Sequence, residues 1–310
     1  MRIDTERSLL LAGLVALLFV ATLGRSELTT AAESGDAFPW IVSPERAVEL
    51  IEEGDASVLD TRGKSRWKRG HLPGAVRADW ETFTPSKKAD RGELLADTSR
   101  LERRIRRLGV DADRPVLVVG NPPDNWGEDG RIVWMLRTLG HERVALVDGG
   151  HAAVVEAGVG ETDESSEPEK GDFEVERRET WSADRAAVRK VIDGDSGDVV
   201  LIDTRSAREY AGATPYGESR GGHLPGAKHL HYSDLLTDDG RLLPAAKIRE
   251  KLAGLGVTAD SRVVSYCTGG VRSAWLTVVL AHLGYRAANY PGSAWDWSAA
   301  PEEKHPLVEE

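Results

Sequence analysis

The chain contains a single cysteine, Cys267, which opens a segment whose residue types favour a reactive thiol. The segment reads Cys-Thr-Gly-Gly-Val-Arg-Ser, and its glycines allow successive backbone N–H groups to turn inward around the sulfur. A helix that begins near Ser273 would add the positive end of its dipole, and Arg272 would add a full charge. Each effect stabilises a thiolate over a thiol and lowers the pKa of a cysteine below about 8.5. We therefore predict a nucleophilic thiolate with Cys267 and Arg272 as catalytic residues.

The loop after the cysteine also predicts what the thiolate could carry. A cradle of backbone amides that stabilises a thiolate would equally hold the terminal sulfur of a persulfide anion. The alternative is a buried structural cysteine, which is a common role for an isolated one. The Gly-Gly-x-Arg sequence directly after an apolar strand favours the reactive thiol. The predicted binding residues are Thr268, Gly269, Gly270, Val271 and Ser273.

The elements that position Cys267 belong to a unit that occurs twice in the chain. The unit starts with a Trp and a Ser suited to cap a helix, continues with a helix that ends at a glycine, and then has a short apolar strand ending in Asp-Thr-Arg. Its copies begin at Phe38–Arg62 and Glu179–Arg205. Pro44 lies at the first helical position of the first copy.

The two copies remain in step over more than a hundred residues. Both contain Gly-His-Leu-Pro-Gly-Ala, then an amphipathic helix, a buried-type strand, a second helix and a last short strand. Corresponding pairs include the helices Leu101–Val110 and Ile248–Val257, the strands Val116–Val119 and Val263–Tyr266, and the helices Ile132–Leu139 and Leu276–Leu283. In this register Gly120 takes the place of Cys267, so the first copy has no nucleophile.

Alternating strands and helices predict an α/β fold, in which each copy forms a parallel sheet flanked by helices on both faces. Ligands bind at the carboxyl ends of strands in such sheets, and Cys267 follows the strand Val263–Tyr266. The acidic, proline-containing stretch Glu161–Lys170 reads as a linker or mobile surface loop. We expect an N-terminal segment and linker at 1–36, domains at 37–160 and 179–310, and a linker at 161–178.

Composition excludes several kinds of partner and site. The chain has 40 Lys and Arg against 51 Asp and Glu, a net charge of −11, which gives no basic excess for binding nucleic acid. One cysteine excludes an internal disulfide, a cysteine-rich zinc site and a resolving-cysteine pair. His229 and His231 lack a further ligand cluster. We expect no metal and no cofactor.

The N-terminal residues predict export from the cytoplasm. Leu9–Leu23 is apolar, and no charge lies between Arg7 and Arg25, as in a secretory signal. The uncharged run of 17 residues would span about 25 Å as a helix, short of a hydrocarbon core of about 30 Å. No clean cleavage site follows, so a cleaved signal and a retained membrane anchor both stay open. Either would place the globular part in the periplasm or facing outside the cytoplasm.

Together, the Asp-Thr-Arg strand ends, the Gly-His-Leu-Pro-Gly-Ala turns and the Cys-Thr-Gly-Gly-Val-Arg loop resemble the rhodanese family over about residues 38–300. Tandem copies with cysteine only in the second are similar to thiosulfate and 3-mercaptopyruvate sulfurtransferases. The resemblance implies an inactive N-terminal domain, a catalytic C-terminal domain and a persulfide on Cys267. It also implies substrate-binding arginines, with Arg208 matching one and Arg220 a candidate for another.

The resemblance leaves the sulfur donor open. Asp60 and His71 match an Asp–His pair that mercaptopyruvate enzymes place at the domain interface. The serine that joins the pair in those enzymes corresponds to Gly269, so the relay is incomplete. Thiosulfate enzymes favour basic residues after the cysteine, where this chain has Thr268 and Gly269. Because sulfite needs less proton assistance to leave than an enolate, we predict a preference for thiosulfate, and a Gly269→Ser shift toward mercaptopyruvate if Asp60 and His71 face the loop.

Three functions compete on this evidence. In the first, a small donor passes sulfur to Cys267, and a thiol, cyanide or a thioredoxin-like protein removes it. In the second, the chain is a non-enzymatic persulfide carrier that hands sulfur to a protein partner. The third is a cysteine-dependent phosphatase, because a related fold hosts phosphatases of this kind. It is disfavoured because only four residues separate Cys267 from Arg272, whereas phosphatases have five.

Overall fold

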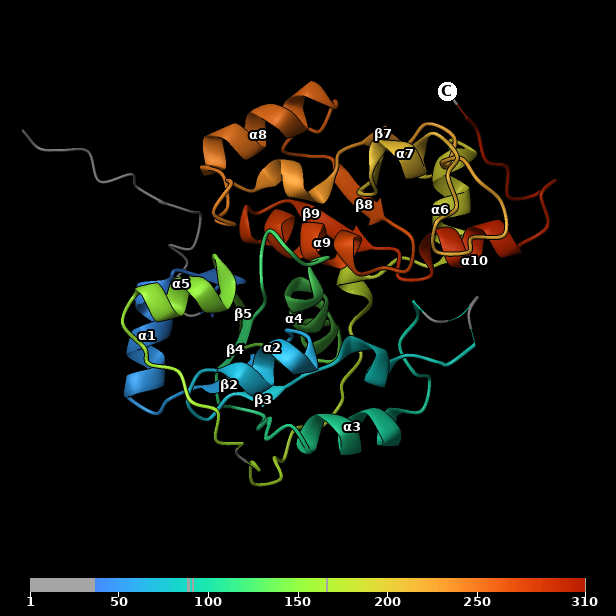
Figure 1. Ribbon diagram of the computed structural model, residues 1–310. Coiled ribbons are helices and arrows are strands. Elements are labelled where there is room, and N and C mark those ends of the chain that lie inside the picture. Colours follow the sequence, from blue (N-terminus) through green and yellow to red (C-terminus); the bar gives the residue numbers. More distant parts are fainter. Residues whose placement is uncertain (1–36, 88–89, 91, 166, 310) are drawn as a thin grey trace, which may run out of the picture.

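The computed structural model describes residues 37–87, 90, 92–165 and 167–309, which form two α/β domains stacked on each other (Figure 1). The hydrophobic run Leu9–Leu23 and the rest of residues 1–36 lie outside the described residues. Within the described part of the chain, no helix combines the length and apolarity that crossing a membrane requires.

The first domain is built on a five-stranded parallel sheet with the strand order β1-β5-β4-β2-β3. Its strands are β1 (Ile41–Val42), β2 (Ser57–Asp60), β3 (Val76–Arg77), β4 (Val116–Val119) and β5 (Val144–Val147). Its helices are α1 (Pro44–Glu52), α2 (Lys64–Arg69), α3 (Thr98–Arg106), α4 (Glu128–Thr138) and α5 (Gly150–Glu156), with a 3-10 turn at Trp80–Phe83.

The second domain repeats the arrangement with a four-stranded parallel sheet in the order β7-β6-β8-β9. Its strands are β6 (Val199–Asp203), β7 (Lys228–His229), β8 (Arg262–Tyr266) and β9 (Arg286–Asn289). Its helices are α6 (Arg185–Ile192), α7 (Ala207–Tyr210), α8 (Ala245–Gly254), α9 (Arg272–His282) and α10 (Ser293–Ala299), with 3-10 turns at Glu179–Trp181 and Tyr232–Leu235. The predicted fold class, two tandem parallel sheets covered on both faces, is confirmed.

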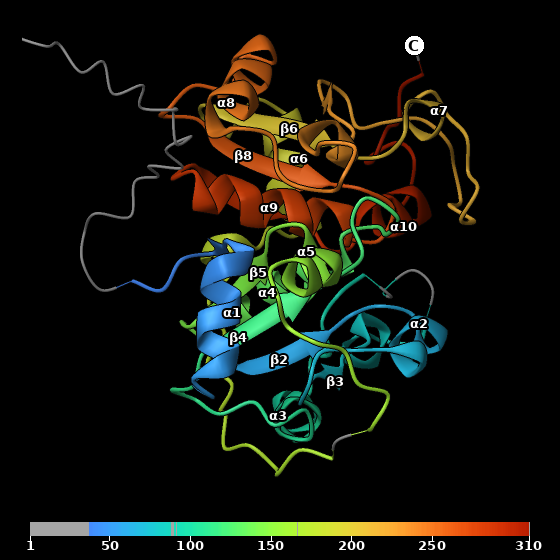
Figure 2. The same cartoon turned by 60° about the vertical axis from the view of Figure 1, so that its left-hand side comes forward.

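The central strands alternate between two buried faces, as expected when helices cover both sides of a sheet. On β4, Val116 and Val118 face the core shared with the second domain, whereas Leu117 and Val119 face α1 and α5. On β8, Val263 faces the shared core and Val264 faces the outer core of the second domain. Helices α4 and α9 lie between the two sheets (Figure 2).

Helix starts follow local sequence signals, with one correction. The Ser43 side chain accepts the Arg46 N–H at 3.3 Å and caps α1 ahead of Pro44, as predicted. The corresponding prediction for Ser182 is wrong, because Asp184 caps α6 by accepting the Ala187 N–H at 2.7 Å. The 3-10 turn ends just before Ser182, and α6 begins at Arg185, two residues later than a cap at Ser182 would place its start.

The connection between the domains is held against the first domain. Beyond Glu161–Lys170, the main chain donates N–H bonds from Gly171 to Arg106 O (2.8 Å) and from Glu176 to Leu139 O (2.9 Å). Phe173 within it is buried. The predicted linker therefore ends in an ordered segment that packs on the first domain.

Candidate active site

The thiol of Cys267 lies at the carboxyl end of β8, where the chain turns into α9, and is 1% exposed. Its backbone is fixed from both sides by the start of α10. The Cys267 N–H donates to Ser293 Oγ at 3.1 Å, and Cys267 O accepts the Ala294 N–H at 3.0 Å. Ser293 has φ of 50°, in the left-handed region that non-glycine residues rarely adopt.

The surroundings of the sulfur favour its anionic form. Burial raises the pKa of the Cys267 thiol, but the Arg272 charge, the N–H and hydroxyl of Ser273 and the Gly269 N–H lower it, and the net pKa lies below its usual range. The start of α9 thus presents N–H groups to the sulfur, as the sequence predicts for a loop at a helix N-terminus. The Ser273 hydroxyl also reaches Asn289 Oδ1 at 2.6 Å.

Arg272 is held by Glu209, a residue that the sequence analysis missed. Its guanidinium donates to both carboxylate oxygens of Glu209 at 2.8 and 2.7 Å, and to Thr268 Oγ1 at 2.8 Å. The Thr268 hydroxyl in turn donates to Glu209 at 2.9 Å. Burial raises the pKa of Glu209, but Arg272 and the hydroxyls of Ser206 and Thr268 bring it down to about 2. The charge of Arg272 is therefore shared with a carboxylate.

A sequence signal for Glu209 existed. Ser206 and Glu209 form a capping box at the start of α7, which is the Ser-x-x-Glu pattern of a helix N-terminus. The pattern predicts a helix start, and nothing in it predicts that the same carboxylate reaches α9.

The glycines of the loop are required because other groups fill the space beside them. A Cβ on Gly269 would lie 2.3 Å from the ring of Trp295, and one on Gly270 would lie 2.5 Å from Pro291 O. Gly270 also has φ of 74°. The serine of mercaptopyruvate enzymes therefore cannot enter at 269 unless Trp295 moves.

The predicted arginines beside the loop differ in their surroundings. Arg208 lies exposed on the short helix α7, next to Glu209 in the chain. Arg220 is engaged by the C-terminal segment, where its guanidinium donates to four backbone carbonyls, those of Trp297, Ser298, Ala300 and His305, at 3.0 to 3.2 Å. Through these contacts Arg220 holds the C-terminal segment in place within the second domain.

The predicted interface pair, Asp60 and His71, bonds partners in the first domain and in the linker that packs on it. Asp60 is fully buried and accepts a forked ion pair from Arg62 at 2.7 to 3.1 Å. His71 bonds the carbonyls of Trp67 (2.9 Å) and Glu164 (3.1 Å). Asp203 and Arg205 repeat the ion pair in the second domain. None of the hydrogen bonds that Asp60 and His71 make among the described residues reaches the Cys267 loop.

The first domain fills the position of its missing cysteine with a carboxylate. A Cβ on Gly120 would lie 2.1 Å from Oδ2 of Asp129, in the first turn of α4. Asp129 is buried, and burial raises its pKa to about 7, partly offset by the Gly130 N–H that it accepts at 2.8 Å. The loop cannot accept a cysteine at this point without displacing Asp129.

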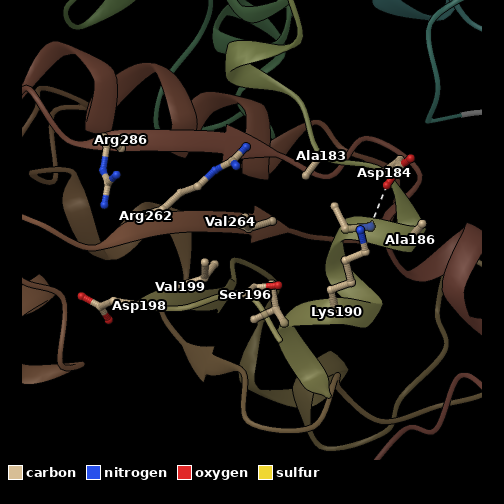
Figure 3. Close-up of a pocket in the computed structure, with 12 residues that line it drawn as sticks. Ala183, Asp184, Ala186, Lys190, Ser196, Asp198, Val199, Arg262, Val264 and Arg286 are labelled. Carbon is tan, nitrogen blue, oxygen red and sulfur yellow. Dashed lines mark hydrogen bonds between the residues drawn. The ribbon is translucent and has the colours of Figure 1, made fainter. Parts of the chain in front are cut away.

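A hollow of about 650 Å³ on the second domain lies away from this chemistry (Figure 3). Arg262 and Arg286, at its rim, begin β8 and β9, so the hollow is at the amino ends of the strands, opposite Cys267. In the part of the chain that the structure describes, no three His, Cys, Asp or Glu side chains gather as metal ligands would.

Two stacked parallel α/β domains, with one cysteine at a strand end in the second, define a tandem protein with a single thiol site. The Rhodanese-like domain family matches residues 43–157 and 187–300, and the chain belongs to this family. It is 32% identical over 268 residues to a thiosulfate sulfurtransferase of Corynebacterium glutamicum, covering 81% of this chain and 82% of that protein. It is 31% identical over 277 residues to the sulfur carrier protein TtuD of Thermus thermophilus, covering 85% and 95%.

A solved structure supports the arrangement of the two domains. The 3-mercaptopyruvate sulfotransferase SseA of Escherichia coli is 24% identical and superimposes with a TM-score of 0.71. The match covers 83% of this chain and 99% of that one. At this identity the likeness establishes the fold alone.

Proposed function

We propose that the chain is a sulfurtransferase that moves sulfane sulfur from a small donor to a thiol or cyanide through a persulfide on Cys267. The observation that carries the proposal is the position of the cysteine at a strand end, under the N–H groups that begin α9 and with a lowered pKa. A thiolate in this position is the attacking species in thiol–sulfur exchange.

Two displacements at sulfur would complete the reaction. With thiosulfate, the Cys267 thiolate attacks the outer sulfur, an S–S bond forms, and the old S–S bond breaks as sulfite leaves with its electron pair. An acceptor thiolate then attacks the outer persulfide sulfur and leaves as a persulfide while Cys267 returns as thiolate. The loop amides and the start of α9 stabilise the anion in both resting states, which is consistent with ping-pong kinetics.

Intact mass provides the direct test of this proposal. Incubation with thiosulfate or mercaptopyruvate should add one sulfur atom to the protein, and cyanide or a dithiol should remove it. Cys267→Ser should gain no sulfur and show no transfer. Full transfer activity in that variant would overturn the proposal.

The charge at the loop is tested by comparing two arginines with similar partners. Arg272→Ala and Arg62→Ala each leave a buried carboxylate, Glu209 or Asp60, without its arginine. We expect similar losses in the free energy of unfolding, because each variant leaves a buried carboxylate without a partner for its charge. Only Arg272→Ala should lower the rate of sulfur transfer per folded molecule, by about tenfold or more. Equal and small losses of activity would contradict a role for Arg272.

For the donor, we propose thiosulfate ahead of mercaptopyruvate. Mercaptopyruvate releases an enolate that needs a proton, and Asp60 and His71 make their hydrogen bonds to the first domain and the linker rather than to the Cys267 loop. Steady-state kinetics with both donors should give the larger kcat/KM for thiosulfate. A preference of about tenfold for mercaptopyruvate, worth about 1.4 kcal/mol in the transition state, would show this ranking to be wrong.

A persulfide carrier is the second candidate, and the similarity to the carrier TtuD favours it. The same thiolate site would serve both functions. In a carrier, the persulfide forms on mixing but small acceptors do not turn it over, and a protein acceptor, such as a thioredoxin-like protein, is required. A burst without turnover in the presence of cyanide and small thiols would favour the carrier.

We also propose that the chain is exported, from the apolar run Leu9–Leu23 between Arg7 and Arg25. A fusion of residues 1–40 to a reporter that is active only outside the cytoplasm should be active. The same fusion with two arginines placed within Leu9–Leu23 provides the control and should be inactive. An unaltered fusion that is made but stays inactive, like the arginine control, would contradict export.

A further inference from the structure

A buried arginine of the first domain, Arg131 on α4, reaches the catalytic loop of the second domain. Its guanidinium donates to Gly270 O at 3.1 Å and to Gly92 O at 2.6 Å. Gly270 lies in the loop between Cys267 and α9, whereas Gly92 belongs to the first domain. Arg131 is 1% exposed, so the contact lies inside the domain interface.

Gly92 itself packs closely against the same loop. A Cβ on Gly92 would lie 2.0 Å from Pro291 O and 3.0 Å from Gly269 O, and one on Gly270 would lie 3.0 Å from a nitrogen of Arg131. Only glycines allow the two domains to approach this closely at the thiol. The loop that holds Cys267 is therefore shaped partly by the first domain.

Arg131 has no carboxylate as an ion-pair partner among the described residues. The buried ion pairs in that part of the chain are Asp60–Arg62, Asp203–Arg205 and Glu209–Arg272. Arg131 bonds carbonyl oxygens instead, and its guanidinium lies 4.5 Å from the ring centre of Trp134 and 5.9 Å from that of Trp80. A buried cation is costly unless a nearby anion compensates its charge.

The anions that interact electrostatically with Arg131 are Glu93 and Cys267. Burial lowers the pKa of Arg131 to about 10, while these two groups offset part of that shift, so the guanidinium stays charged at neutral pH. Burial raises the pKa of Glu93 to about 6, which weakens it as a counter-ion. Because Arg272 already shares its charge with Glu209, Arg131 is the less compensated cation near the sulfur.

We infer that Arg131, supplied by the domain that lacks a cysteine, is a positioning residue that fixes the Gly270 carbonyl and adds to Arg272 a second buried positive charge near the Cys267 thiolate and its persulfide. The persulfide part rests on the proposed function, and the thiolate part does not. The first domain, inactive by itself, thereby contributes to the site of the second.

The test is the pH dependence of Cys267 alkylation by iodoacetamide, read by intact mass on the full chain. One cysteine makes the label unambiguous, and no sulfur donor is needed. Among the described residues, the charged or titratable groups that act on the thiol or its neighbours include Arg272 on α9, Glu209 on α7, Arg131 on α4, Glu93 before α3, Asp296 on α10, Asp203 at the end of β6 and His231 after β7. Wild type, Arg131→Gln, Arg131→Lys and Glu93→Gln would be compared.

Arg131→Gln should raise the apparent pKa of Cys267 by about one unit, which slows alkylation at neutral pH by about tenfold. Arg131→Lys keeps a positive charge and should recover most of the wild-type profile. Glu93→Gln should shift the pKa the opposite way, because it removes the competing anion. This variant leaves Arg131 in place, so it keeps the inference testable if Arg131→Gln does not fold.

Arg137 provides a matched control on the same helix. It is also buried, its guanidinium also bonds only carbonyls among the described residues, at Phe38, Pro39 and Val144, and it lies 4.5 Å from the ring centre of Trp40. Arg137→Gln should cost comparable stability and leave the alkylation profile unchanged. The inference is overturned if Arg131→Gln keeps the wild-type profile, or if Arg137→Gln shifts it equally. Failure of wild type to take up sulfur would overturn the proposed function alone.

Discussion

Ser293 shows how a single residue can hold a reactive loop at some conformational cost. Its φ of 50° is unfavourable for a side chain with a Cβ, typically by about 1–3 kcal/mol. Its hydroxyl accepts the N–H of Cys267 and donates to Tyr290 O at 2.7 Å. The residue with the strained backbone is thus the one that fixes the backbone of the nucleophile.

Replacement of Ser293 separates these two effects. Ser293→Ala keeps the strained φ and leaves the buried Cys267 N–H without its acceptor, so we expect a loss of about 1–3 kcal/mol in the free energy of unfolding and a slower sulfur transfer. Ser293→Gly relieves the strain and should be the more stable of the two. Denaturant unfolding and transfer rates measure both effects. An alanine variant with wild-type stability and activity would show that the hydroxyl does not hold the loop.

At the scale of elements, the loop before α4 and the loop before α9 occupy equivalent places in the two domains but differ in length and in the group beside the cysteine position. In the second domain five residues lie between β8 and α9, and the cysteine is the first of them. In the first, a longer loop with a cis peptide between Pro122 and Pro123 runs from Gly120 to α4, and Asp129 occupies the space of the missing side chain. The repeat identifies the missing nucleophile, but it does not identify what replaces it.

The buried carboxyl of Asp129 predicts a pH-dependent stability. Its folded-state pKa of about 7 is above its unfolded value of 3.8, so its favourable contribution is complete below pH 3.8 and is lost as the pH rises through about 7. Asp129→Asn stays neutral at every pH. Relative to wild type, it should be about 4 kcal/mol more stable at pH 8 than at pH 4. Denaturant unfolding at both pH values tests this, with the exposed Asp113→Asn as control. A constant difference between variant and wild type would contradict a buried, neutral Asp129.

The sequence predicts elements better than it predicts contacts between them. The strand at Val116–Val119, the caps at Ser43 and the glycine helix ends follow from local rules and are found in the structure. Arg131 and Glu209 carry no such signal, because their roles depend on how helices from distant parts of the chain approach Cys267. Asp60 and His71 were suggested by resemblance, and in the structure they bond the first domain and the linker rather than the Cys267 loop.

At the scale of the whole molecule, the two domains share one hydrophobic core. Buried side chains from both sheets join through α4 and α9 into a single cluster, which includes Ile132 and Leu136 from the first domain and Ala274 and Val278 from the second. Interfaces between domains are usually smaller and more polar than this. We therefore expect the domains to unfold together, and the contact of Arg131 with the catalytic loop depends on their packing.

Helices α4 and α9 approach closely at Gly130, and two opposite effects on stability can be expected from a substitution there. Helix propensity alone predicts that Gly130→Ala stabilises the protein by about 1 kcal/mol. However, the new Cβ would lie 2.5 Å from the Cα of Trp275, so α4 and α9 must separate. Overpacking of this kind costs about 1–3 kcal/mol, and it would also move the adjacent Arg131 away from Gly270. We therefore expect a lower midpoint in a single denaturant transition, together with slower sulfur transfer. Gly254→Ala, in the last turn of α8 with open space around it, is the control and should not lose stability. If Gly130→Ala is more stable than wild type and equally active, the domains are not held together at this crossing in the way the structure implies.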